Sequence, residues 1–217
     1  MTKKVWHPVA LAAFVVFGAS MASAQSIRVE DLDVGRFLVS ARDLPDPSFA
    51  ESVILLIQHD KGGTVGLMIN RRTEAPISRI LEDLNTAKHG SEPIYVGGPV
   101  GMNAALGLFR SQKKPDGAAT SLLGDVYVVS SKALLEKTLA ASSGPNDMRI
   151  YMGYCGWAVG QLENEVRQGG WWIFDGDARL VFDPYPASVW SRLITWTERQ
   201  IASTQRQRFR LCLRIRG

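Results

Sequence analysis

Gln161 and Glu165 are the polar residues in this sequence that are best spaced for chemistry, because they lie four positions apart in a segment with a helical pattern. A β-type run precedes this segment and is broken by two glycines. Ligands often bind at such a strand-to-helix corner, where backbone N–H groups point away from the sheet. The sequence therefore predicts a binding surface at this corner, formed by Gly153, Gly156, Trp157, Gln161 and Glu165.

The helix at this corner is expected to begin near Trp157 and to bury Val159, Leu162 and Val166 on one stripe. Its polar edge would then face a cleft. The alternative is that the polar edge is solvated and that Trp157 only packs against the core.

A second glycine-rich segment, made of Gly97, Gly98 and Pro99, is expected to complete the binding surface. Glycine allows a backbone to approach a ligand closely and to adopt positive φ. The alternative is a tight turn between two strands. The expected partner of the surface is a small molecule or another protein.

Asp46 and Glu165 are the carboxylates that an enzyme acting on a small polar substrate would use as acid or base. A capped turn anchored by Phe49 explains the segment around Asp46 equally well, and we favour the turn. His59 and Asp60 form a poor acid–base pair, because adjacent strand residues point to opposite faces.

The sequence lacks the motifs of the main enzyme classes. After residue 24 it has only two histidines, and it has no His-Glu-x-x-His, Gly-x-Ser-x-Gly, phosphate-loop or Gly-x-Gly-x-x-Gly segment. We therefore expect no cofactor and no metal, and the sequence favours a non-enzymatic protein over an enzyme.

The pattern of apolar residues predicts six to eight strands and about four flanking helices in a single α+β domain, with a mainly antiparallel or mixed sheet. Ser52–His59 is apolar on both faces and predicts a buried strand, which Gly62 and Gly63 turn into a hairpin. A short pairing strand is expected at 180–182. Helices are expected over 76–84, from a cap at Ser130 or Ser131 to about Ala141, after Trp157, and over 186–201.

The first 24 residues are typical of a secretory signal peptide. Lys3 and Lys4 precede an unbroken apolar run, and small residues end at Ala24. We expect cleavage after Ala24 and a periplasmic or secreted protein, or a cytoplasmic one if translation starts near Val34. Cys155 is expected to be a small buried residue, with a bond to Cys212 as the alternative.

The formal charge of +4 comes from the two ends of the chain, because without them acidic residues outnumber basic ones. We place the domain at 25–202 and a basic tail at 203–217. The tail alternates apolar and basic residues, which predicts a two-faced strand, an anchor at an anionic membrane surface, or a frayed end. Nucleic acid is a weaker expectation for an exported protein. The basic residues of the tail are Arg206, Arg208, Arg210, Arg214 and Arg216.

Several segments match one family pattern in order and spacing. They are 37–40 with 44–49, 52–59 with 63–70, 96–100, 153–157 with 160–163, and 169–171 with 182–183 and 189–193. On these segments the chain, from about Arg36 to Ile201, resembles the YqgE/AlgH family. The resemblance implies a compact α+β domain with a bifurcated, barrel-like sheet, and it implies little about chemistry.

Some members of the family are named as transcriptional regulators, through a link to alginate production. Most members lack a signal peptide, so the first 24 residues of this chain depart from the pattern and argue against direct gene regulation. The other departures are Arg72 where proline is frequent, Cys155 where alanine is usual, and the Arg-rich end. The sequence thus favours an exported binding or regulatory protein over a small-molecule enzyme and over an envelope protein held by its tail.

Overall fold

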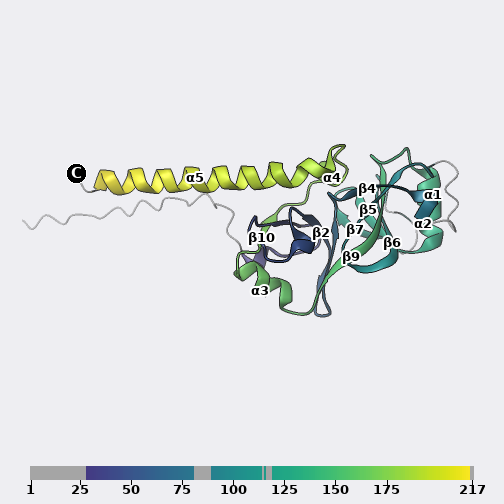
Figure 1. Cartoon of the computed structure of the whole chain (residues 1–217), viewed down its shortest axis with the longest axis horizontal. Helices are drawn as coiled ribbons and strands as arrows, with labels where there is room; N and C mark the ends of the chain where they lie inside the picture. The colour runs from purple at the N-terminus through teal and green to yellow at the C-terminus, as the bar shows by residue number, and fades with distance from the viewer. Residues whose placement is uncertain (1–27, 81–88, 114, 116–118, 216–217) are drawn as a thin grey trace, which may run out of the picture.

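The structure is a computed structural model that describes residues 28–80, 89–113, 115 and 119–215, with the backbone alone for residue 80 and for residues 205–215. Strands and helices combine in an α+β fold (Figure 1). The strands are β1 (Phe37–Ser40), β2 (Val53–Asp60), β3 (Gly63–Met68), β4 (Arg72–Pro76), β5 (Pro93–Val96), β6 (Val100–Arg110), β7 (Thr120–Leu123), β8 (Val126–Val129), β9 (Met148–Trp157) and β10 (Trp171–Phe174). The helices are α1 (Ile77–Ile80), α2 (Lys132–Ala141), α3 (Gln161–Arg167), α4 (Ala178–Val181) and α5 (Val189–Ile215), with 3-10 turns at η1 (Val29–Asp31), η2 (Pro47–Phe49) and η3 (Pro186–Ser188).

The ten strands within the described residues form one open sheet in the order β10-β1-β2-β3-β9-β6-β8-β7, and β4 and β5 branch from it. The branch is at β9, which pairs antiparallel with β3 near Trp157 and antiparallel with β6 over much of its length. The same strand also pairs parallel with β5 through Tyr151 and Met152. The prediction of a mixed, mainly antiparallel and bifurcated sheet is confirmed.

The predicted hairpin is confirmed as β2 and β3. Residues Val53 to Leu56 are fully buried, as expected of a strand covered on both faces. At the turn, Asp60 Oδ1 accepts a hydrogen bond of 2.7 Å from the N–H of Gly62, and Gly63 has φ 123°. A side-chain cap and a positive φ together reverse the chain within two residues.

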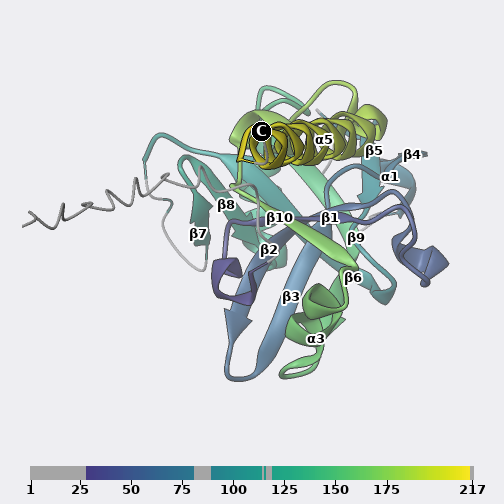
Figure 2. The same cartoon turned by 90° about the vertical axis from the view of Figure 1, so that its left-hand side faces the viewer.

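The two faces of the sheet are covered by different helices. Successive residues of β1 and β2 alternate between the faces, so Val53 and Leu55 pack with the start of α5 while Ile54 and Leu56 pack with α3. At the far end of the sheet, a third cluster packs α2 against β6, β8 and β9. Figure 2 shows α5 on one side of the strands and α3 on the other.

The prediction of a strand at 180–182 is wrong, because this segment forms the helical turn α4. Asp177 Oδ1 accepts a hydrogen bond of 2.8 Å from the N–H of Arg179 and caps the start of the turn. The guanidinium of the buried Arg149 donates to the carbonyls of Val181, at 2.9 Å, and Asp183, at 2.6 Å. Both ends of the turn are thus satisfied by side chains, one of which comes from a distant strand.

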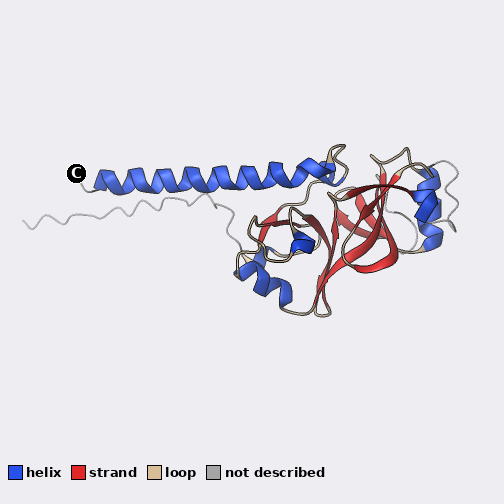
Figure 3. Cartoon of the chain, viewed as in Figure 1, coloured by secondary structure: helices blue, strands red, loops and turns tan. Residues whose placement is uncertain are grey.

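The predicted last helix is confirmed and is longer than expected, since α5 continues to Ile215. The strand alternative for the basic tail is therefore wrong over the described backbone. No glycine or proline interrupts the segment, and its Arg, Gln and Leu residues are strong helix formers. The described buried residues of α5 lie in its first half, and the second half extends past the sheet (Figure 3).

Three expected segments lie wholly or partly outside the described residues. They are the signal peptide, the second half of the helix predicted over 76–84, and the last two residues of the basic tail, which include Arg216. The first half of that helix is present as α1. Within the described part of the chain, no helix is long and apolar enough to cross a membrane.

Candidate functional site

The strand-to-helix corner differs from the prediction in where the helix begins. β9 continues through Gly153 and Gly156 to Trp157, and α3 begins only at Gln161, after Gly160 with φ 78°. Val159 therefore lies in the turn and is 69% exposed, so the prediction that it is buried is wrong. Leu162 and Val166 are buried under α3, as predicted.

Gly97 and Gly98 lie directly against Gly153, although the sequence separates them by more than fifty positions. The N–H of Gly97 donates a hydrogen bond of 2.8 Å to the carbonyl of Met152. A Cβ at Gly97 would lie 2.3 Å from the carbonyl oxygen of Gly153, and a Cβ at Gly98 would lie 2.2 Å from the carbonyl carbon of Tyr154. The glycines bring two backbones into contact and leave no room for a ligand between them, whereas Pro99 and Gly156 are exposed.

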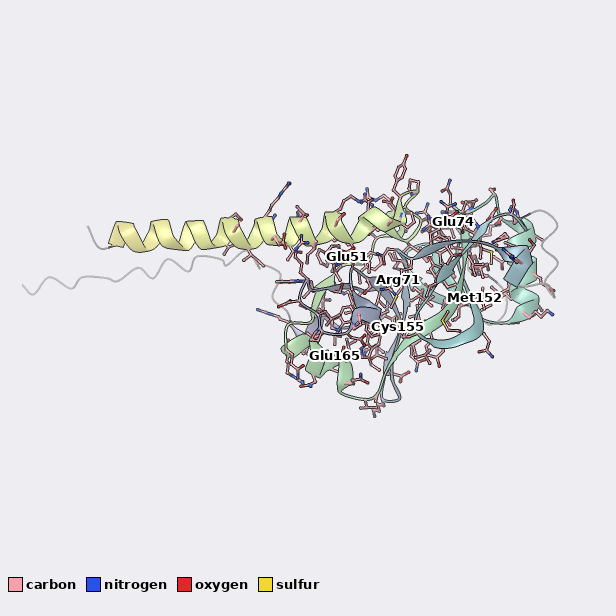
Figure 4. The ribbon with its side chains drawn as sticks, in the orientation of Figure 1. Glu51, Arg71, Glu74, Met152, Cys155 and Glu165 are labelled. Carbon is pink, nitrogen blue, oxygen red and sulfur yellow. The ribbon has the colours of Figure 1, made fainter. Side chains whose placement is uncertain are left out.

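Glu165 lies on α3 (Figure 4), and its carboxylate accepts hydrogen bonds from three side chains. Its Oε2 accepts from Trp157 Nε1 at 3.0 Å and from Trp171 Nε1 at 2.9 Å, while its Oε1 accepts from Gln161 Nε2 at 3.0 Å. Gln161 in turn accepts from the N–H of Ala158 at 3.1 Å. One carboxylate therefore fixes two buried indole rings and the first turn of α3.

A pocket of about 390 Å³ opens beside this carboxylate. Its lining includes both carboxylates that the sequence suggested as acid or base, Asp46 and Glu165, which come from segments far apart in the chain. Phe49 forms one wall, and its ring stacks on Trp157 with centroids 5.9 Å apart. The described residues that line the pocket are Asp43, Leu44, Pro45, Asp46, Phe49, Gln161, Glu165, Gln168, Gly169 and Gly170.

The pocket carries negative charge. Asp43, Asp46 and Glu165 supply three carboxylates, and among the described lining residues there is no basic side chain. Asp46 Oδ1 accepts a hydrogen bond of 2.8 Å from the N–H of Ser48, which is the capped turn that the sequence suggested. That cap positions Asp46 at the pocket instead of excluding it from a binding role.

Other candidate residues lie outside this pocket. His59 Nδ1 is 2.8 Å from Thr64 Oγ1, while Asp60 accepts from the side chain of Gln58, so each of the two has a partner other than its neighbour. Cys155 is a free thiol on β9 (Figure 4), and burial raises its pKa to about 12. At neutral pH this sulfur is a buried neutral group and not a nucleophile.

Sequence reasoning missed three residues of the pocket region, Asp43, Gln168 and Trp171. Asp43 and Gln168 line the pocket from a loop and from the end of α3, and Trp171 donates to Glu165 from β10. The only local signal was the loop composition around Asp43. No group of three or more metal-ligating side chains occurs within the residues that the structure describes.

Comparison with known proteins places the chain among relatives of similar size. A UPF0301 protein of Streptomyces coelicolor is 35% identical over 167 residues, with 74% of this chain and 84% of that protein covered. A UPF0301 protein of Methylococcus capsulatus is 33% identical, with 74% and 88% covered.

Two solved structures share the fold. The solution structure of the AlgH protein from Pseudomonas aeruginosa is 31% identical, with a TM-score of 0.62 over 74% of this chain and 86% of that one. A crystal structure from Corynebacterium diphtheriae has the same TM-score at 24% identity, over 75% and 85% of the two chains. The AlgH-like family model matches residues 37–202. The chain therefore belongs to the AlgH-like family.

Proposed function

We propose that this protein is an exported binding protein, and that the pocket beside Glu165 holds a small polar ligand with a positively charged group, such as an amine or a guanidinium. The observation that carries the proposal is the convergence of Asp43, Asp46 and Glu165 on one pocket without a basic side chain among its described lining residues. A cation would gain attraction from all three carboxylates. Phe49 would cover the apolar part of the ligand.

Binding is favoured over acid–base catalysis by the hydrogen bonds of Glu165. Both of its oxygens accept hydrogen bonds from side chains. Two of the three donors are indole N–H groups, which can only donate and which use Glu165 as their acceptor. The oxygens of Glu165 are therefore already engaged as hydrogen-bond acceptors within the protein. Asp46 is the remaining candidate for an acid or base, and it would have to act alone in an exposed position.

A ligand panel tests the binding proposal. Thermal unfolding of the parent protein is followed with small amines, diamines, amino acids and guanidino compounds, and with uncharged analogues of the same size. We expect a charged member to raise the melting temperature and its uncharged analogue to have no effect. Calorimetry then gives the dissociation constant.

Asp46→Asn removes a charge from the pocket and retains an oxygen that can cap the turn. Loss of a contact worth about 1 kcal/mol weakens binding about 5-fold. Asp60→Asn is the matched control, because Asp60 also caps a turn and lies outside the pocket. The proposal fails if no charged compound binds, or if Asp46→Asn binds the ligand as tightly as the parent does.

Export is supported by the pattern of the first 24 residues. Mass spectrometry of the N-terminus in fractionated cells tests it. We expect a mature chain that begins at Gln25 in the periplasmic or secreted fraction. A chain that retains Met1, or one that begins near Val34 in the cytoplasm, contradicts export and makes a cytoplasmic ligand the relevant one.

A further inference from the structure

A second cluster of reactive side chains lies at the other end of the sheet, where α2 packs (Figure 1). His89 Nδ1 is 2.5 Å from Glu92 Oε1, and His89 Nε2 is 3.5 Å from Ser142 Oγ. His89 and Ser142 are 6% and 8% exposed, and the Glu92 side chain is 16% exposed. The imidazole of His89 thus contacts a hydroxyl through one ring nitrogen and a carboxylate through the other, which is the order of groups used in nucleophilic catalysis.

Two segments position these groups, the end of α2 and the turn before β5. Ser142 follows the last residue of α2, and its N–H bonds to the carbonyl of Leu139. Glu92 immediately precedes β5, and its carbonyl accepts a hydrogen bond of 2.8 Å from the N–H of Ile77. The N–H of Glu92 also bonds to the carbonyl of His89, which holds the histidine and the carboxylate in one turn.

Ser142 also lines a cavity of about 510 Å³, a volume in the range of small-molecule sites. His89 is not among the described residues that line this cavity. Among the described residues that line the cavity, three are basic, Arg110, Lys113 and Lys137, and one is acidic, Asp147. Phe109 and Leu134 contribute apolar surface. The composition suits a small molecule with an apolar part and an anionic group.

We propose that Ser142, His89 and Glu92 form a hydrolytic site for small acyl esters that carry an anionic group. Ser142 Oγ attacks the ester carbonyl carbon and passes its proton to His89 Nε2. The C–O bond to the alcohol then breaks, and the alcohol leaves with that proton. A water molecule cleaves the acyl-serine by the same path in reverse, which releases the acid and restores the hydroxyl.

Glu92 is the positioning residue of this site. In the proposed reaction its carboxylate, 2.5 Å from Nδ1, accepts the Nδ1 proton of His89, so that Nε2 on the other side of the ring can take the proton of Ser142. Ser142 Oγ also lies 3.0 Å from the carbonyl of Leu139, to which it donates in the resting state. The hydroxyl hydrogen must rotate from this carbonyl to His89 before attack, and a distance of 3.5 Å is in keeping with the looser contacts of unliganded sites.

A fluorophosphonate probe tests the nucleophile in the full-length protein, because it reacts with an activated serine and releases fluoride. We expect one adduct, located at Ser142 by peptide mass spectrometry. Ser142→Ala should abolish labelling, and His89→Gln should slow it about 100-fold or more. Ser143→Ala is the matched control, since Ser143 is the exposed neighbour and should label at the parent rate.

Two further measurements separate catalysis from a structural contact. Glu92→Gln should slow labelling, and Glu92→Asp, which keeps the charge, should recover part of the rate. The 4-nitrophenyl monoester of succinic acid should be hydrolysed faster than 4-nitrophenyl acetate, and Lys137→Gln should remove that preference. Unfolding curves of each variant establish that it is folded.

The proposal is overturned if the folded parent forms no adduct at Ser142 under conditions that label a known serine hydrolase. It is overturned equally if His89→Gln labels at the parent rate. In either case, Ser142 and His89 form only a contact between the end of α2 and the turn before β5.

Discussion

At the residue scale, Glu165 has a structural role that is separate from any ligand. Trp157 is 4% exposed and Trp171 is fully buried, and both donate their indole N–H to this one carboxylate. Their rings also contact each other edge to face, with centroids 6.0 Å apart. Substitution of Glu165 therefore changes the core as well as the pocket, and Asp46 is the better residue for testing binding.

Glu165→Ala should lower the free energy of unfolding by about 2 to 4 kcal/mol, because it leaves two indole donors without their acceptor. Urea unfolding measures the change. Asn164→Ala is the control, since Asn164 is an exposed residue on the same helix and should change stability by less than about 0.5 kcal/mol. Equal stability of the two variants would contradict the structural role.

Asp183 gives stability that depends on pH. Burial raises the pKa of its carboxyl, but hydrogen bonds from Arg192 and from the N–H of Tyr185, together with the charges of Arg192 and Arg149, outweigh burial and hold the pKa below its usual value. An acid with a lowered native pKa stabilises the fold fully above its unfolded pKa of about 3.9. That contribution is lost as the pH falls through the lower native pKa.

The parent should therefore be more stable than Asp183→Asn at about pH 6, and the difference should shrink towards about pH 2. Urea unfolding at several pH values measures it. Arg192→Gln should reduce the same difference, because Arg192 is the charged partner of Asp183. A difference that is constant from neutral to acid pH would contradict the assignment.

At the scale of elements, two glycines with positive φ differ in their surroundings: Gly153 of β9 contacts the β5–β6 turn, whereas Gly160 lies in the open turn before α3. Gly153 has φ 72°, and a Cβ there would lie 2.5 Å from the carbonyl oxygen of Gly98. Gly160 has a similar φ of 78°, but a Cβ there would have no heavy atom within 4 Å. Substitutions at the two positions therefore distinguish the cost of a positive φ from the cost of a steric clash.

Gly160→Ala should cost about 1 to 2 kcal/mol, the strain of a left-handed conformation. Gly153→Ala should cost clearly more, because the added Cβ would also clash with the carbonyl oxygen of Gly98 in the β5–β6 turn. Thermal or urea unfolding of the two variants makes the comparison. Equal losses of stability in the two variants would mean that the β5–β6 turn moves away from β9 at little cost.

At the scale of the whole molecule, two sites of opposite charge lie at opposite ends of one sheet. The acidic pocket is lined by residues of α3 and of the loop before β2, and the basic cavity is lined by residues of α2. Figure 1 shows α3 and α2 at opposite ends of the sheet. The long pairing of β9 with β3 and β6 connects the two ends. The ribbon of α5 extends past the sheet (Figure 1).

The extended part of α5 suggests contact with an anionic membrane surface. Arg206, Arg210 and Arg214 are four positions apart on the helical backbone and therefore share one face. The chain from Gln25 should sediment with vesicles containing phosphatidylglycerol and remain in solution with phosphatidylcholine alone. A chain that ends after Ile201 should keep its fold and lose sedimentation. Binding by both chains, or by neither, would contradict a role of the tail.

The sequence alone determined the local elements. Ser52–His59 and the glycines that follow it predicted the hairpin correctly, because alternation, β-branching and turn residues act within a few positions. The same local reasoning failed at 180–182, where Arg149 from a distant strand satisfies the carbonyls of α4. It also ended α5 too early, since tail residues that alternate like a strand also have high helix propensity.

The candidate site around the corner from Gly153 to Glu165 was likewise predictable only in its local parts. From the sequence alone, Gln161 and Glu165 form a polar helix edge, and Asp46 caps a turn. Only the tertiary structure brings Asp46 to Glu165 in one pocket and His89 to Ser142 beside another. Spacing along the chain determines which residues share an element, whereas strand order and the packing of helices on the sheet decide which distant side chains meet.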